Sequence, residues 1–337
     1  MSTRKWLTEP DEYVCTLPEE TQRIAREELR EDDNIRSQAL ASMRHWIMNN
    51  PRIVNCRLDA KFLLRFLRSK KFCVPQAQVA LEQYLLLRQT FGVAFSNLDI
   101  RIPMMEELTD QGFILGCPNR DSQGRRIMIA RPGVFDLYQY TNADMLRLTG
   151  IACETLLEDE ENQIRGLVYF ADGQGVGLSY LSLFTLKEAV RLVKNGERIL
   201  PVRHKEVHGI NVHPSMKFLC DFGTSLVSDK IKKRIKIYSD LNDFINNGNM
   251  DLELLPKEYG GSIPMSEMIA SWKEELRKSH GLLLLHDQMC INENLFSAKE
   301  KEGAVSALKR GISGVHCGGE EDPLYGVTGN FRKLEVD

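Results

Sequence analysis

The sequence lacks the segments that mark membrane-spanning and secreted proteins. No apolar run approaches the roughly 20 residues that cross a bilayer, and Gly281 to Leu285 is far shorter. The first residues, MSTRKWLTEPDEY, contain no apolar stretch of the kind found in a secretory signal peptide. We therefore expect a cytoplasmic protein whose contacts with membranes are peripheral and reversible.

The chain also lacks an excess of charge of one sign and any paired-cysteine motif. A net charge of -3 argues against a dedicated nucleic-acid binder, so we expect no nucleic-acid partner, and any basic function must come from local clusters. The 8 cysteines are scattered without a Cys-x-x-Cys pair. This pattern predicts free thiols in a reducing compartment.

Motifs for catalysis, cofactors and metals are missing as well. The sequence contains neither a Walker-type phosphate loop nor a Gly-x-Ser-x-Gly nucleophile motif. The glycines of YFADGQGVGLSY have the spacing G-x-G-x-G, which differs from the dinucleotide pattern. His204, His208 and His213 have no thiol or carboxylate at a known ligand spacing. We expect no catalytic residue, no cofactor and no metal site.

The amino-terminal part has the pattern of a helical module. Helical periodicity runs from Thr16 to about Asn50, and Asp59 precedes the strongly helical run AKFLLRFLRSKKF. In that run one apolar face is expected beside charged faces; the apolar residues are Phe62, Leu63, Phe66 and Leu67, and the charged ones are Arg65, Arg68, Lys70 and Lys71. We predict a tail over residues 1–20 and an all-helical module over 21–95.

Strands alternating with helices follow. A turn at 121–124 separates two apolar runs, Thr141 or Asn142 can cap a helix over 143–160, and GLVYFAD reads as a buried strand. A helix over 185–198 and a strand over 207–212 come next. The pattern predicts an α/β domain with a mainly parallel sheet over residues 96–280, and a carboxy-terminal tail over 281–337.

The stretch from Asn211 to Arg234 joins an apolar helical stripe to a basic cluster. A helix of this composition can lie on an anionic bilayer as a lid. Taken alone, the segment favours an ordinary core helix with a solvated basic end, and other parts of the chain favour the lid. The stripe consists of Val212, Met216, Phe218, Leu219, Phe222 and Leu226. The basic residues after the stripe are Lys230, Lys232, Lys233, Arg234 and Lys236.

Further cations approach the predicted strand. Arg203 and Lys205 alternate, so their side chains should share a face, and Lys230 and Arg234 share a helical face. Clustered cations of this kind hold phosphorylated headgroups through charge-assisted hydrogen bonds. The alternative is ordinary solvated surface charge.

Several of these segments, in this order, resemble the CRAL-TRIO family of lipid-binding proteins and follow the pattern of its vitamin-carrier branch. They are FLLRFLRSKKF, GLVYFAD, LPVRHKEVHGINVHP, SDKIKKRI and LPKEYGG, which together span roughly Leu58 to Trp272. The resemblance implies a helical module followed by an α/β lipid cage. It also implies a mobile gate helix over the mouth of the cage, at about Val212 to Arg234.

The resemblance also implies site residues. The phosphoinositide-contacting cations fall on Lys70, Arg203, Lys205, Lys230 and Arg234. Positions similar to the family's cavity lining are Leu146, Cys153, Leu167, Leu192, Leu200, Val202 and Val207.

The function implied is that of a carrier without catalysis. It would hold a small hydrophobic lipid, such as a tocopherol or retinoid, in a closed cavity. It would exchange this lipid at phosphoinositide-containing membranes, endosomal or otherwise intracellular. The alternative is a phosphoinositide-sensing adaptor in membrane trafficking that recruits a protein partner through its helical module or tail. An enzyme acting on the lipid is the third reading, although no nucleophile or acid–base set stands out.

Overall fold

Helices form the amino-terminal part of the molecule in the computed structural model, which describes residues 5–90, 95–183, 188, 190, 193–194, 196–197, 199–298 and 300–301. The helices are α1 (Glu19–Leu29), α2 (Asp33–Asn49), α3 (Ala60–Ser69) and α4 (Val74–Thr90). The side chain of Asp59 caps α3 by accepting from the Phe62 backbone N–H. The expected stretch from Thr16 is two helices, because Arg30 adopts a left-handed conformation with φ of 64° and ends α1.

A five-stranded sheet in the order β3-β4-β5-β6-β7 forms the centre of the second part. Its strands are β3 (Ile114–Arg120), β4 (Arg126–Ala130), β5 (Leu167–Asp172), β6 (His204–Ile210) and β7 (Ile235–Ile237). β3 and β4 form an antiparallel hairpin around the expected turn at 121–124, and all other neighbours in this sheet are parallel. The α/β fold with a mainly parallel sheet is confirmed, although β6 begins and ends earlier than the predicted 207–212.

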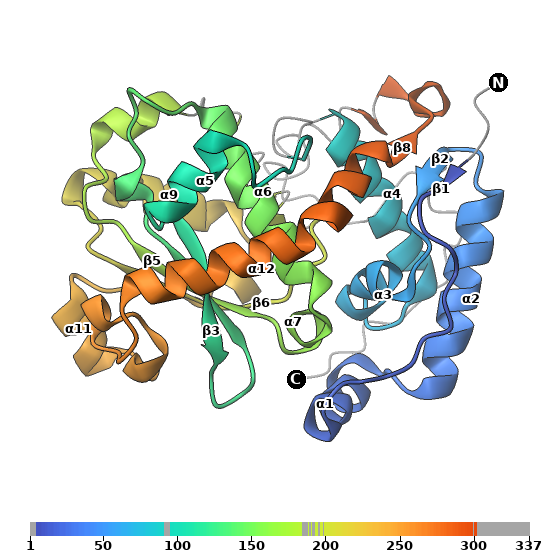
Figure 1. The fold of residues 1–337 in the computed structure, drawn as a ribbon, viewed down its shortest axis with the longest axis horizontal. Coiled ribbons are helices and arrows are strands. Elements are labelled where there is room, and N and C mark those ends of the chain that lie inside the picture. The colour runs from blue at the N-terminus through green and yellow to red at the C-terminus, as the bar shows by residue number, and fades with distance from the viewer. Residues whose placement is uncertain are drawn as a thin grey trace.

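Helices cover the two faces of this sheet differently. Figure 1 shows α12 (Met265–Leu285) crossing the sheet near β3, with α6 (Asn142–Glu158) and α5 (Pro103–Asp110) beside it. Trp272 of α12 lies against Gly116 of β3. Phe170 of β5 points to the opposite face, where it meets Phe244 of α11 (Leu241–Asn247) and Tyr259. Because side chains alternate along a strand, Tyr169 lies on the same face as α12 and α6.

The segment after α12 folds back onto the helical module. β8 (Cys290–Ile291) pairs with β2 (Ile53–Cys56), which also pairs with β1 (Lys5–Trp6). Met289, Ile291 and Phe296 are buried in the core of the module. The expectation of a tail from residue 281 therefore missed ordered structure, because a two-residue strand leaves no periodic pattern. Residues 302–337 lie outside the described part.

Helix α3 is buried on its charged faces too, which corrects the expectation for Arg65 and Arg68. Both side chains have 0% exposure. Arg65 pairs with Glu154 of α6 at 2.8 Å, and Arg68 pairs with Glu31 at 2.8 Å. Arg65 also pairs with Glu158 of α6 at 2.7 Å. The two Arg65 pairs join the helical module to α6, whereas the Arg68–Glu31 pair lies within the module; only the tertiary structure supplies these carboxylates.

Candidate functional site

Arg203 and Lys205, at the start of β6, share one carboxylate. Arg203 Nη2 lies 2.5 Å and Lys205 Nζ lies 3.4 Å from the same oxygen of Glu28 on α1. Burial alone would raise the pKa of Glu28, but its bond to Arg203 and the charges of Lys205 and Arg203 lower it. Burial and the charge of Arg203 lower the pKa of Lys205. The two cations therefore act as one site, with Glu28 as their present anion.

Lys230, on α10 (Asp229–Lys232), adds a third cation to Arg203 and Lys205. Its pKa is lowered by burial and by three neighbouring cations, Arg234, Lys71 and Arg203. The structure thus brings Arg203, Lys205, Lys230 and Arg234 together, as the resemblance implies, and we call these four residues and Lys71 the basic cluster.

Lys71 was not among the residues expected at this site. It is exposed and has a left-handed conformation with φ of 49°, so the chain turns away from α3 there. The pKa of the adjacent Lys70 is lowered by burial. The doubled lysine in the sequence was the available signal, and the turn decides which lysine faces the cluster. A role for Lys70 stays a prediction.

The expected gate helix is a series of shorter elements. It comprises a turn of 3-10 helix, η4 (Pro214–Met216), then α9 (Lys217–Leu226) and α10. Val227 is extended between α9 and α10, and Ser228 caps α10, so the apolar and basic parts are separate helices. No residue of α9 is buried, and Phe218 is 57% exposed. The other stripe residues are partly exposed; they are Val212, Met216, Leu219, Phe222 and Leu226.

The expected cavity residues fall into separate surroundings. Leu167 is buried in the core of the sheet, and Val202 packs against that core. Leu146 is buried with the core of the helical module, and Leu200 packs against it. Cys153 and Val207 keep accessible surface, and Leu192 lies outside the described residues. The positions are thus distributed between the sheet and the module rather than joined in one core.

The side chains around Cys153 keep accessible surface although they are surrounded by protein. Cys153, Tyr169 and His204 are only partly buried by accessible surface. Yet burial raises the pKa of the Cys153 thiol to about 12 and raises that of Tyr169 well above its usual value. Burial also lowers the pKa of His204. Side chains that keep accessible surface while being surrounded by protein are typical of the lining of an enclosed space. Sequence reasoning missed Tyr169 and His204, since a tyrosine in an apolar strand looks like core.

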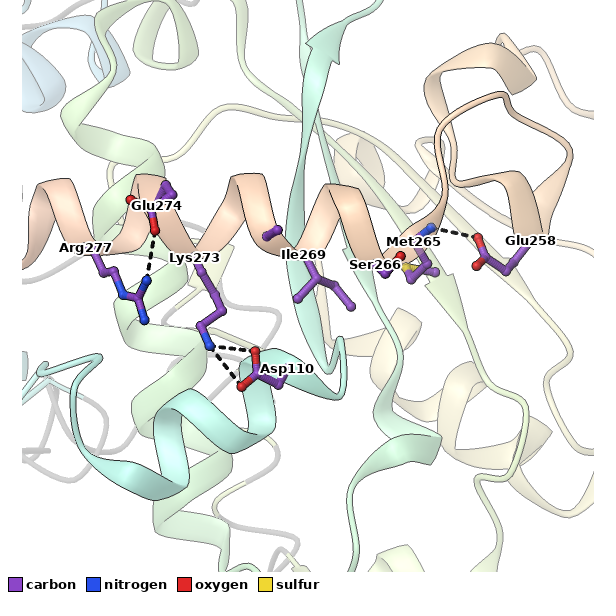
Figure 2. Close-up of a pocket in the computed structure, with 9 residues that line it drawn as sticks. Asp110, Glu258, Met265, Ser266, Ile269, Lys273, Glu274 and Arg277 are labelled. Atoms are coloured by element: carbon purple, nitrogen blue, oxygen red, sulfur yellow. Dashed lines mark hydrogen bonds and ion pairs between the residues drawn. The ribbon is translucent and has the colours of Figure 1, made fainter.

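An open groove of about 610 Å³ lies elsewhere, between α12 and α5. Figure 2 shows its charged side chains already paired, with Lys273 bound to Asp110 at 2.7 Å and Arg277 to Glu274 at 2.8 Å. Its open shape and paired charges make it a poor site for a hydrophobic ligand.

Two further features are absent from the described residues. None of the helices placed by the structure has the length and apolarity needed to cross a bilayer. Within the same residues, no group of three or more His, Cys, Asp or Glu side chains could hold a metal ion.

Comparisons with known proteins agree with this fold. The family model for the CRAL/TRIO domain matches residues 110–261. The mouse (Mus musculus) "Alpha-tocopherol transfer protein-like" is 31% identical over 275 residues, which are 80% of this chain and 78% of that protein. Human (Homo sapiens) "Clavesin-2" is 30% identical over 269 residues, 77% of this chain and 79% of the relative.

A solved structure, "Crystal structure of Sfh5", superposes with a TM-score of 0.50 over 71% of this chain and 92% of that chain. Its 14% identity supports the fold alone. The matched domain and the relatives that align over most of their length show the family: this chain belongs to the CRAL/TRIO family.

Proposed function

We propose that this protein is an intracellular carrier. It binds a small hydrophobic lipid, such as a tocopherol or retinoid, in a closed cavity and exchanges it at phosphoinositide-containing membranes through the segment 212–234. Membership of a lipid-binding and lipid-transfer family supports the general class. The observation that carries the proposal is that the side chains around Cys153 keep accessible surface although protein surrounds them. In addition, the apolar helix α9 has no buried residue.

Helix α9 has the features expected of a gate. Its apolar residues are partly exposed and do not belong to the buried cores of the described chain. Exposed apolar surface costs roughly 25 cal/mol per Å², so such a helix is stabilised when a ligand or a bilayer covers it. A gate needs this marginal attachment, because it must exchange protein contacts for lipid contacts at little net cost.

The basic cluster lies where a membrane-bound gate would need it. α10 follows α9 after two residues, Val227 and Ser228, so Lys230 and Arg234 stay near the apolar surface of α9. Arg203 can bind a phosphate with two parallel hydrogen bonds, and lysines add charge. A phosphorylated headgroup would therefore replace Glu28 as the anion and hold the gate at the bilayer.

The energetics favour release into a membrane over release into water. Transfer of an apolar tail into water costs about 0.8 kcal/mol per CH₂ group, so a long tail leaves a closed cavity very slowly. A gate that opens into a bilayer offers an equally apolar destination and removes that cost.

The test fills the cavity. Leu167→Trp and Val202→Trp should lower ligand occupancy, measured by native mass spectrometry after incubation with lipid vesicles, at some cost in stability from overpacking. Leu282→Trp, at a partly exposed site on α12, is the matched control. Unchanged occupancy in both folded cavity variants contradicts the cavity. Recruitment to vesicles without transfer of lipid between them would instead favour the adaptor function.

A further inference from the structure

Tyr169 and His204 form a polar pair on the sheet face that is covered by α6, the helix of Cys153. The Tyr169 hydroxyl lies 2.7 Å from His204 Nδ1. His204 reaches this face through a register shift: Leu167 is opposite His204, but Val168 is opposite Glu206, so Lys205 is an extra residue. Such bulges re-aim side chains and often lie beside functional sites. The bulge turns His204 towards Tyr169.

The hydrogen bonds fix where the protons lie. His204 Nε2 is 3.1 Å from the carbonyl oxygen of Gly196, which can only accept, so Nε2 carries a hydrogen. Burial lowers the pKa of His204, so the ring is neutral at pH 7 and Nδ1 is an acceptor. The Tyr169 hydroxyl must then donate to Nδ1. In the part of the chain that the structure describes, His204 is the hydrogen-bond partner of this hydroxyl, and none of these residues donates to its oxygen lone pairs.

We propose that the Tyr169 oxygen accepts a hydrogen bond from a hydroxyl group of the bound lipid, so that the cavity selects an apolar alcohol or phenol. This inference rests on the proposed carrier function and adds the chemical class of the ligand. An ether, ester or aldehyde of the same shape has no hydrogen to donate. It would place an acceptor against an acceptor in a desolvated space.

The size of the preference follows from the cost of an unmade hydrogen bond. Leaving a buried polar group unpaired costs about 1–2 kcal/mol, so an alcohol should bind roughly five- to thirtyfold more tightly than its methyl ether.

The experiment compares each alcohol with its own ether in one sample. The full-length protein is equilibrated with phosphatidylcholine vesicles that contain equal amounts of an alcohol and its methyl ether, and native mass spectrometry counts the bound ligands. Retinol, α-tocopherol and octadecanol, each with its methyl ether, supply different apolar bodies. We expect the alcohol form to dominate in the wild type by the factor given above.

Substitution of the pair supplies the decisive comparison. In Tyr169→Phe, which keeps the ring and removes the acceptor, the ratio of alcohol to ether should fall to about one. Tyr238→Phe is the matched control, because Tyr238 forms a similar pair with His208 at 3.4 Å. His208 packs against Phe244 on the opposite face of the sheet, so this control should keep the wild-type ratio.

A second variant covers the case in which Tyr169→Phe does not fold. In His204→Leu, the Tyr169 hydroxyl loses its acceptor and can donate to an ether oxygen, so the preference for the alcohol should shrink. Two results would overturn the proposed hydrogen bond to Tyr169: equal binding of alcohol and ether by the wild type, or an unchanged preference in a folded Tyr169→Phe or His204→Leu. Neither result would contradict the proposed carrier function. Failure of the wild type to bind any of these compounds contradicts both.

Discussion

Helices α3 and α9 are both ten residues long, both carry an apolar stripe and both lead into basic residues. Yet eight residues of α3 are buried, two of them arginines, and none of α9 is. Protein covers α3 on its apolar side and around both arginines, leaving Lys61 exposed, whereas the apolar residues of α9 are covered only in part. Helical periodicity therefore shows that a stripe exists, but it does not show whether protein, ligand or membrane covers it.

The charges of the two regions differ in the same way. Arg65 of α3 has two carboxylates, Glu154 and Glu158, within 2.8 Å, and its side chain has no exposure. Arg203 and Lys205 share Glu28, whose side chain is 45% exposed. The first arrangement holds two parts of the molecule together, and the second can be displaced by another anion.

The largest effect is expected at the buried pair. Arg65→Met leaves Glu154 without its closest cation in a site from which water is excluded, and loss of one partner of a buried pair costs about 3–5 kcal/mol. Urea unfolding should show this loss of stability.

Arg23→Met is the control, because Arg23 pairs with Glu20 and Glu27 on the surface of α1. It should leave the urea midpoint unchanged. An equal effect of both substitutions would show that the contribution of the Arg65–Glu154 pair to stability does not depend on its burial.

The gate is expected to show the next largest effect, on the rate of transfer. Phe218→Asp with Phe222→Asp removes apolar contacts with the bilayer worth about 1.5–3 kcal/mol each, so transfer of a fluorescent hydrophobic ligand between vesicles should slow tenfold or more. The thermal midpoint should change little, because neither side chain is buried.

Val14→Asp with Tyr138→Asp is the matched control, since these side chains are 74% and 102% exposed. A wild-type transfer rate in the Phe218 and Phe222 variant would refute the gate assignment.

Local signals in the sequence predicted much of the fold. The cap at Asp59, the cap at Thr141 and the apolar run of β5 are set by neighbours in the chain, and all appear in the structure. The burial of Arg65 and the pairing of β8 with β2 depend on residues far along the chain. The residues of the candidate site divide in the same way between local and distant causes.

At the site, the resemblance placed four cations that the structure brings together, but Lys71 and His204 depend on a turn and a bulge. Neither the turn nor the bulge has a reliable pattern in a single sequence. Side-chain direction at these two points therefore had to come from the three-dimensional structure.

Loss of cations from the basic cluster should weaken vesicle binding. Each Lys or Arg near an anionic membrane surface contributes about 1 kcal/mol, so Arg203→Ala with Lys205→Ala should reduce binding to phosphoinositide-containing liposomes roughly thirtyfold at low salt. Sedimentation with liposomes measures this. Lys273→Ala with Arg277→Ala removes two ion-paired cations from the groove of Figure 2 and should have little effect. Equal pelleting of wild type and the Arg203 and Lys205 variant, with and without phosphoinositide, would contradict the site.

Substitution of Glu28 should have the smallest and most specific effect on liposome binding. If it competes with lipid phosphate for Arg203 and Lys205, then Glu28→Gln should strengthen binding to the same liposomes by about two- to fivefold, the range of an exposed ion pair. The lowered pKa of Glu28 means that the pairing persists at neutral pH and is lost only as pH falls through that lowered value. The wild type and the variant should therefore differ at pH 7 and converge in acid.

Glu27→Gln changes the net charge of α1 equally, but Glu27 pairs with Arg23 instead. If this control strengthened binding as much as Glu28→Gln, the gain would come from overall charge, and Glu28 would not be a competitor. If only Glu28→Gln does so, the anion that now holds the basic cluster is the one that a membrane phosphate displaces. The contrast with α3 then has a functional meaning, because the carboxylates that bind its arginines, those of Glu154 and Glu31, are buried beyond the reach of any competing anion.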